Sequence, residues 1–77
     1  MTIDKRLVMV EWTDAACDNS WRTADAVVDP SICWTVGWLY HESPEQIMIV
    51  GTIAEGGDFN QSMTIPFGMV KSMKDVT

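Results

Sequence analysis

Apolar residues recur at every second position over much of this chain, which is the period of a β-strand rather than of a helix. The clearest run covers residues 32–40, where every second side chain is large and apolar or aromatic: Ile32, Trp34, Val36, Trp38 and Tyr40. A second run near the start places Val8, Val10 and Trp12 on one face. No window keeps a 3.6-residue period for three turns. The pattern therefore predicts an all-β protein.

Turn-forming residues divide the pattern into five short antiparallel strands. The expected ranges are 6–12, 32–42, 46–55, 61–66 and 70–76. Pro66 cannot continue a central ladder, so we expect a single 3₁₀ turn before the last strand. Gly37 in mid-strand predicts a bulge or a sharp bend, as small barrels need at their corners. Together these features predict a small five-stranded antiparallel barrel, closed or nearly closed.

The first connection is long and polar, and it is expected to carry a short helical turn. Thr23 can cap such a turn and Asp25 suits its first residues, while Pro30 ends it. We expect Trp21 and the valines after it to fold this connection back onto the sheet. The predicted core consists of the apolar residues assigned to inward faces: Val8, Val10, Trp34, Val36, Ile47, Ile49, Ile53, Ile65 and Val70.

Length and composition indicate one small domain over residues 1–77. The chain has 77 residues, of which 47% are hydrophobic, too many for a disordered protein. No apolar run approaches the roughly 18 residues that span a bilayer, and no basic and apolar leader opens the chain. We therefore expect a cytoplasmic protein with no membrane contact.

The formal net charge of −6 argues against binding to duplex nucleic acid, which depends on cations. Four of the five cations lie near the chain ends, at Lys5, Arg6, Lys71 and Lys74. If the first strand neighbours the last, they can form a positive patch for an anionic ligand. Ordinary surface charge explains the same residues.

Metal, cofactor and disulfide chemistry find little support. A structural zinc site takes four cysteine or histidine ligands, but the chain has only Cys17, Cys33 and His41. We expect no metal, no cofactor and two free thiols, although the count alone allows a Cys17–Cys33 disulfide. A core this small needs further burial, so we expect a homo-oligomer.

Catalysis is not expected either. His41 lies beside Glu42 at a predicted hairpin end, where a histidine is usually solvated, and no nucleophile stands in a recognisable motif. Acidic pairs in the loops serve as turn formers and caps. The weakest alternative is a nucleotide hydrolase that uses Asp14, Asp18 and a metal.

The tryptophans provide the candidate binding site. Four of them cannot all be buried in so small a barrel, and Trp21 lies in a polar loop. Aromatic rings stack on flat ligands, and an arginine can hold their anionic groups. The candidate ligand site therefore combines Trp12, Asp14, Trp21 and Arg22. A loop packed on its own barrel would carry the same residues.

Three motifs carry a resemblance: Val10-Glu11-Trp12-Thr13-Asp14-Ala15, Val36-Gly37-Trp38-Leu39 and Ile65-Pro66-Phe67-Gly68-Met69-Val70. With Trp21, they resemble short uncharacterised bacteriophage proteins, and the strand order is similar to that of Src-homology and Sm-like small barrels. The chain lacks the N-terminal helix of Sm proteins, and its 55–58 turn is acidic where Sm proteins have a basic RNA-binding loop.

The phage resemblance implies a role in the cytoplasm of the host cell. There the protein would counter host defence by sequestering a small anionic or nucleotide-like ligand between its subunits. The alternative is an interaction module that docks on a host or phage protein.

Overall fold

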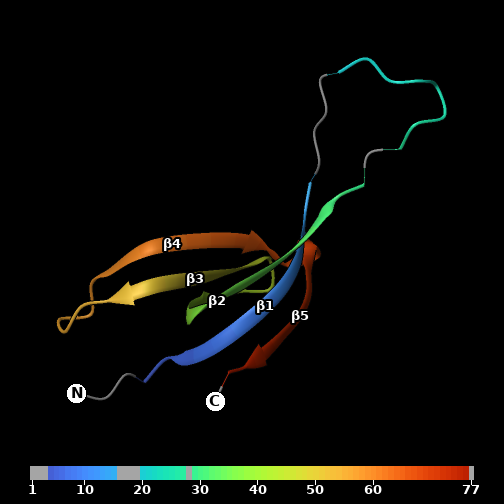
Figure 1. Cartoon of the computed structure of the whole chain (residues 1–77). Coiled ribbons are helices and arrows are strands. Elements are labelled where there is room, and N and C mark those ends of the chain that lie inside the picture. Colours follow the sequence, from blue (N-terminus) through green and yellow to red (C-terminus); the bar gives the residue numbers. More distant parts are fainter. Residues whose placement is uncertain (1–3, 16–19, 28, 77) are drawn as a thin grey trace.

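The computed structural model describes residues 4–15, 20–27 and 29–76 (Figure 1). The predicted all-β class and its five antiparallel strands are confirmed. The strands are β1 (Arg6–Asp14), β2 (Ser31–Glu42), β3 (Gln46–Ile53), β4 (Phe59–Pro66) and β5 (Val70–Asp75). The predicted 3₁₀ turn is also present, as η1 (Phe67–Met69) between β4 and β5.

All five strands lie in one sheet, in the order β4-β3-β2-β1-β5. Each neighbouring pair is antiparallel, including β1 with β5, where Val8 lies opposite Asp75. β4 and β5 are the two edges of this sheet, and no ladder joins them in the described part of the chain. The sheet is therefore open, and the closure expected of a barrel is not observed.

β2 is the strand that both halves of the sheet share. It pairs with β1 over Ser31–Leu39 and with β3 only over Trp38–Glu42. At Gly37, β3 comes very close to β2. A Cβ atom at Gly37 would lie 2.5 Å from Ile49 Cγ2 and 2.7 Å from the Val50 carbonyl oxygen. The predicted irregularity is thus a close approach at Gly37, followed by a register shift between Leu39 and His41.

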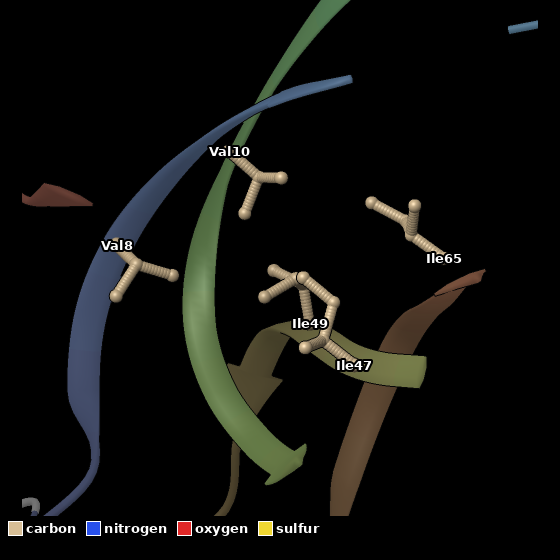
Figure 2. Packing of buried hydrophobic residues seen from close by; sticks show 5 residues of the cluster. All are labelled: Val8, Val10, Ile47, Ile49 and Ile65. Carbon is tan, nitrogen blue, oxygen red and sulfur yellow. The ribbon is translucent and has the colours of Figure 1, made fainter. Parts of the chain in front are cut away.

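The core is a small aliphatic cluster on the inner face of the curled sheet. Figure 2 shows side chains from β1, β3 and β4 pointing toward one another. The fully or almost fully buried members are Val8, Val10, Ile47, Ile49 and Ile65, all of which were predicted to be core. Around them pack the partly buried Trp12, Leu39, Met69, Val70 and Met73. Val70 was predicted as core and lies at this margin, and Ile53 is also only partly buried.

The core prediction is wrong for two residues of β2. Trp34 is 61% exposed and Val36 is 56% exposed. The β1 ladder gives the reason: buried Val10 lies opposite Thr35, and Met9 lies opposite Val36, so Thr35 shares the inner face. The first half of β2 therefore turns its small residues toward the core and its large ones outward, whereas Leu39 in the second half packs against the core.

Val50 is an addition to the expected core. It is fully buried but is not a member of the core cluster. Because Ile49 and Ile47 point inward, alternation places Val50 on the outer face, opposite Trp38 of β2. The outer face near the bend is thus also apolar, so β3 carries apolar side chains on both faces.

The described part of the first connection, residues 20–27, does not fold back onto the sheet. Figure 1 shows it standing away from the strands, and within it Trp21 is 100% exposed and Val27 is also exposed. Of the expected helical turn, the described residues show a single turn, in which Ala26 N–H donates to the Thr23 carbonyl oxygen over 3.0 Å. The described part of this connection carries Arg22 and Asp25 among its apolar residues, as expected of a segment that stays in water.

The close packing at Gly37 generates a stability prediction. Gly37→Ala forces a methyl group against the β3 backbone, so we expect a loss of about 1–3 kcal/mol, the usual cost of overpacking. Gly56→Ala is the matched control, since nothing lies within 4 Å of the added Cβ. Urea unfolding followed by far-ultraviolet circular dichroism measures both. Equal midpoints for the two variants would contradict the close approach.

Candidate functional site

Trp12 belongs to the structure of the sheet rather than to an open binding surface. Its indole Nε1 donates a hydrogen bond to Thr35 Oγ1 over 2.9 Å, and this hydroxyl donates to Met63 Sδ over 3.7 Å. The ring also packs against the core cluster. One polar chain thus links β1, β2 and β4 across the inner face. Trp12 is therefore held by its neighbours, and its side chain is partly buried.

The other three predicted site residues lie at or beyond the end of the β1–β2 ladder. Asp14 is the last residue of β1, exposed and opposite Ser31. Trp21 and Arg22 follow in the first connection and are exposed. Figure 1 shows that this part of the connection stands away from the sheet. The structure therefore separates Trp12 from the loop pair Trp21–Arg22, which places an aromatic ring and a guanidinium next to each other in the chain.

A surface that the sequence analysis missed lies on the outer face of β2. We call it the β2 stripe: Ile32, Trp34 and Val36, which are 47%, 61% and 56% exposed. On β1 the residues opposite the last two are Glu11 and Met9. The period-2 pattern identified this row correctly, but it was assigned to the core. The signal that could have found this surface is the alternate row of side chains on β2. In the first half of the strand that row is small, as is needed on a strand face that packs beneath an indole.

The backbone beside the β2 stripe is also unpaired on one side. Among the described strands, Ser31–Val36 has ladder partners in β1 alone, because the β3 ladder begins at Trp38. We call Ser31–Val36 the free edge. It contains no charged residue, no glycine and no proline. Edge strands usually carry such residues to prevent pairing with other chains, as β5 does with Lys71, Lys74 and Asp75.

An aromatic contact closes the opposite end of the sheet. The Tyr40 hydroxyl donates to the Gly57 carbonyl oxygen over 2.8 Å, and its ring centroid lies 4.5 Å from that of Phe59. Lys5 Nζ lies 4.9 Å from the Tyr40 ring centroid. These contacts fasten the β3–β4 turn to the beginning of β1, which is a structural role.

The terminal cations lie on neighbouring strands, as expected if the first strand neighbours the last. Two of them are paired with carboxylates: Arg6 Nε lies 2.8 Å from Asp75 Oδ1, and Lys71 Nζ lies 3.4 Å from Glu11 Oε2. This pairing favours ordinary surface charge over a patch for anions.

Chemistry-bearing clusters were sought among the described residues. In residues 4–15, 20–27 and 29–76, no three His, Cys, Asp or Glu side chains gather as a metal site would require. No helix in this part of the chain has the length and apolar character to cross a membrane. Cys33 is a free thiol, whereas Cys17 and Asp18 lie outside the described residues.

Comparison with family models, curated proteins and solved structures finds no match to this chain. The resemblance to phage proteins therefore stays a prediction, and any functional argument depends on the chain's own surfaces. The β2 stripe, the free edge and the loop pair Trp21–Arg22 are the features available for it.

The two tryptophans should differ sharply in their effect on stability. Trp12→Phe removes the hydrogen bond to Thr35, so we expect a loss of about 0.5–1.5 kcal/mol. Trp21→Phe changes a fully exposed ring, and surface substitutions usually stay within about 0.5 kcal/mol. Denaturant titration of both variants measures the difference. A Trp21→Phe variant destabilised as much as Trp12→Phe would show that the loop packs on the sheet.

Proposed function

We propose that the protein is a non-enzymatic binding protein that works as an assembly of copies and captures its target stoichiometrically. The observation that carries this proposal is the exposed β2 stripe. Burial of apolar surface contributes about 25 cal/mol per Å², and a tryptophan left mostly in water forgoes much of it. Aromatic residues are enriched where protein surfaces meet, and charged residues are depleted there. The stripe has this composition on an otherwise acidic chain.

The size of the core supports assembly as well. The aliphatic cluster has five members, and a chain of this length buries only about 60% of its unfolded surface. Contact between copies would add the burial that a single chain lacks. The free edge supports the same conclusion, since unpaired backbone groups on an uncharged strand gain hydrogen bonds when another strand arrives.

A finer description of the fold forms part of the proposal. The strand order β4-β3-β2-β1-β5 with a 3₁₀ turn between β4 and β5 supports a Src-homology or Sm-like small barrel. So does the curl that brings inner side chains of β1 and β3 together (Figure 2). In this description β2 forms the corner between two half-sheets, and the gap between β4 and β5 stays open.

The loop pair supports a small anionic, nucleotide-like ligand as the target. Trp21 offers an exposed ring for stacking, and Arg22 carries a cation beside it. Asp14, at the end of β1, can accept hydrogen bonds from a base or a sugar. If the chain is phage-encoded, such capture in the host cytoplasm would counter a host defence signal.

The second candidate function is a module that docks on a host or phage protein. The β2 stripe favours it, because the same aromatic surface that joins copies can join a different partner. The two functions differ in what the stripe binds. An assembly of copies forms from the purified protein alone, whereas the docking module stays monomeric until its partner is added.

Assembly is tested by sedimentation velocity between about 1 and 100 µM. A contact with a binding free energy of about −7 kcal/mol is about half formed at concentrations in this range. We expect oligomers of the native chain, and we expect Val36→Lys to shift the distribution to monomer by placing a charge in the contact. Val76→Lys is the matched control: Val76 is 49% exposed but lies after β5. A native chain that is monomeric throughout would overturn the assembly.

Ligand capture is tested by isothermal titration with AMP and with a cyclic dinucleotide. We expect binding of at least one probe, and we expect Trp21→Ala to weaken it about tenfold, since stacking contributes about 1–3 kcal/mol per base. Trp21→Phe should retain most of the affinity. Heat denaturation should return the ligand unchanged; recovery of a hydrolysed product would instead support an enzyme.

A further inference from the structure

The free edge of β2 combines two properties. Its backbone is paired on one side only, and its outward side chains form the β2 stripe. A strand of six residues rich in β-branched and aromatic side chains, with no charge, proline or glycine, has the composition that pairs readily with another strand. A partner strand would satisfy the backbone groups and cover the stripe at once.

The distribution of charge along the chain indicates which partner binds the free edge. Each copy has a formal net charge of −6, so two copies repel one another over most of their surfaces. Ser31–Tyr40 is a ten-residue segment that contains no Asp, Glu, Lys, Arg or His. A second copy can approach this segment with the smallest electrostatic cost. A strongly basic partner would find no acidic residue there to bind.

We propose that two copies pair through their free edges, antiparallel, about a two-fold axis at Cys33. This inference rests on the proposed assembly and assigns it a surface and a symmetry. Antiparallel pairing about such an axis keeps the inner faces of both copies on the same side of the joined sheet. This requires the residue at the axis to lie opposite the same residue of the second copy. At Cys33 this register sets each Trp34 opposite the second copy's Ile32.

This register has a specific energetic advantage. Pairs of an aromatic and a β-branched residue lying opposite each other stabilise antiparallel ladders by about 0.2–1 kcal/mol relative to alanine. The two-fold arrangement makes two such pairs between Trp34 and Ile32. The small Cys33 side chains meet at the axis, on the inner face that Trp12 shares.

The two-fold arrangement also explains why an unpaired strand edge without charged residues need not lead to aggregation. Pairing between identical edges uses both of them, so the assembly closes at two copies. Pairing between different surfaces would leave an edge open for a third chain and lead to filaments. β5, the edge beside β1, carries charges that discourage such growth. Across the free edges the joined sheet then has the order β5-β1-β2-β2-β1-β5, while β3 and β4 of each copy continue from the second half of its β2.

The register is tested by cross-linking with a short bismaleimide in a Cys17→Ser variant, which leaves Cys33 as the sole thiol. We expect a covalent dimer at least ten times more abundant than in the control, a Cys17→Ser/Cys33→Ser/Ser62→Cys variant. Ser62 is exposed on the edge strand β4 whereas Cys33 is only partly exposed, so the control thiol is at least as reachable as Cys33. A Cys33 yield no greater than the control yield would overturn the register.

Hydrogen exchange of the unmodified chain gives a second measurement that needs no variant. We expect those backbone amides of Ser31–Val36 that point away from β1 to exchange at least tenfold more slowly at 100 µM than under dilute conditions, a protection worth about 1.4 kcal/mol. Amides of Phe59–Thr64 on β4 should not change. If oligomers form while Ser31–Val36 gains no protection, the inference fails and the proposed assembly stands. If the chain is monomeric at every concentration, both fail.

Discussion

A single strand, β2, must serve two neighbours that lie in different directions, and the rest of the fold depends on that requirement. β1 takes its first nine residues and β3 its last five, with an overlap only at Trp38 and Leu39. The absence of a side chain at Gly37 lets β3 cross close above it. This crossing brings Ile47 and Ile49 over Val8 and Val10, which makes a core out of a single sheet (Figure 2). The same division leaves the early half of β2 with only one neighbour.

The inner face is held by two kinds of contact. The aliphatic cluster supplies the hydrophobic burial, and the chain from Trp12 through Thr35 to Met63 fixes how β1, β2 and β4 lie relative to each other. A buried hydroxyl without a partner is costly, but here Thr35 both accepts and donates. In the first half of β2, the indole of Trp12 packs beside the small inner residues Cys33 and Thr35. The large residues Ile32, Trp34 and Val36 lie on the outer face there.

Much of the fold could be predicted from the sequence, because strand periodicity and turn residues are local signals. The five strands, the 3₁₀ turn after Pro66 and five core residues on β1, β3 and β4 follow from them. The orientation of β2 could not be predicted in this way. An alternating strand shows which residues share a face but not which face is inward; the position of Trp12 on β1 decides that. Large apolar side chains usually face the core, and this rule predicts Trp34 and Val36 on the wrong face of β2.

The candidate site was predictable only in part for a similar reason. Turn-forming residues marked the first connection as a loop, and the exposure of Trp21 and Arg22 agrees with that. Whether a loop residue meets a strand residue depends on where the loop goes, and no local pattern encodes its direction. Trp12 was therefore grouped with residues from which the structure separates it. The free edge is likewise invisible in sequence, since it arises from where β3 begins to pair.

The pairing of β1 with β5 has a consequence for biosynthesis. Val76 N–H donates to the Leu7 carbonyl oxygen over 2.9 Å, and Arg6 bonds Asp75 across 69 positions of sequence. A ribosome adds roughly 5–20 residues per second and hides the most recent part of the nascent chain. The first strand therefore emerges long before the last one that completes its ladder, and the sheet is finished only after β5 has left the ribosome.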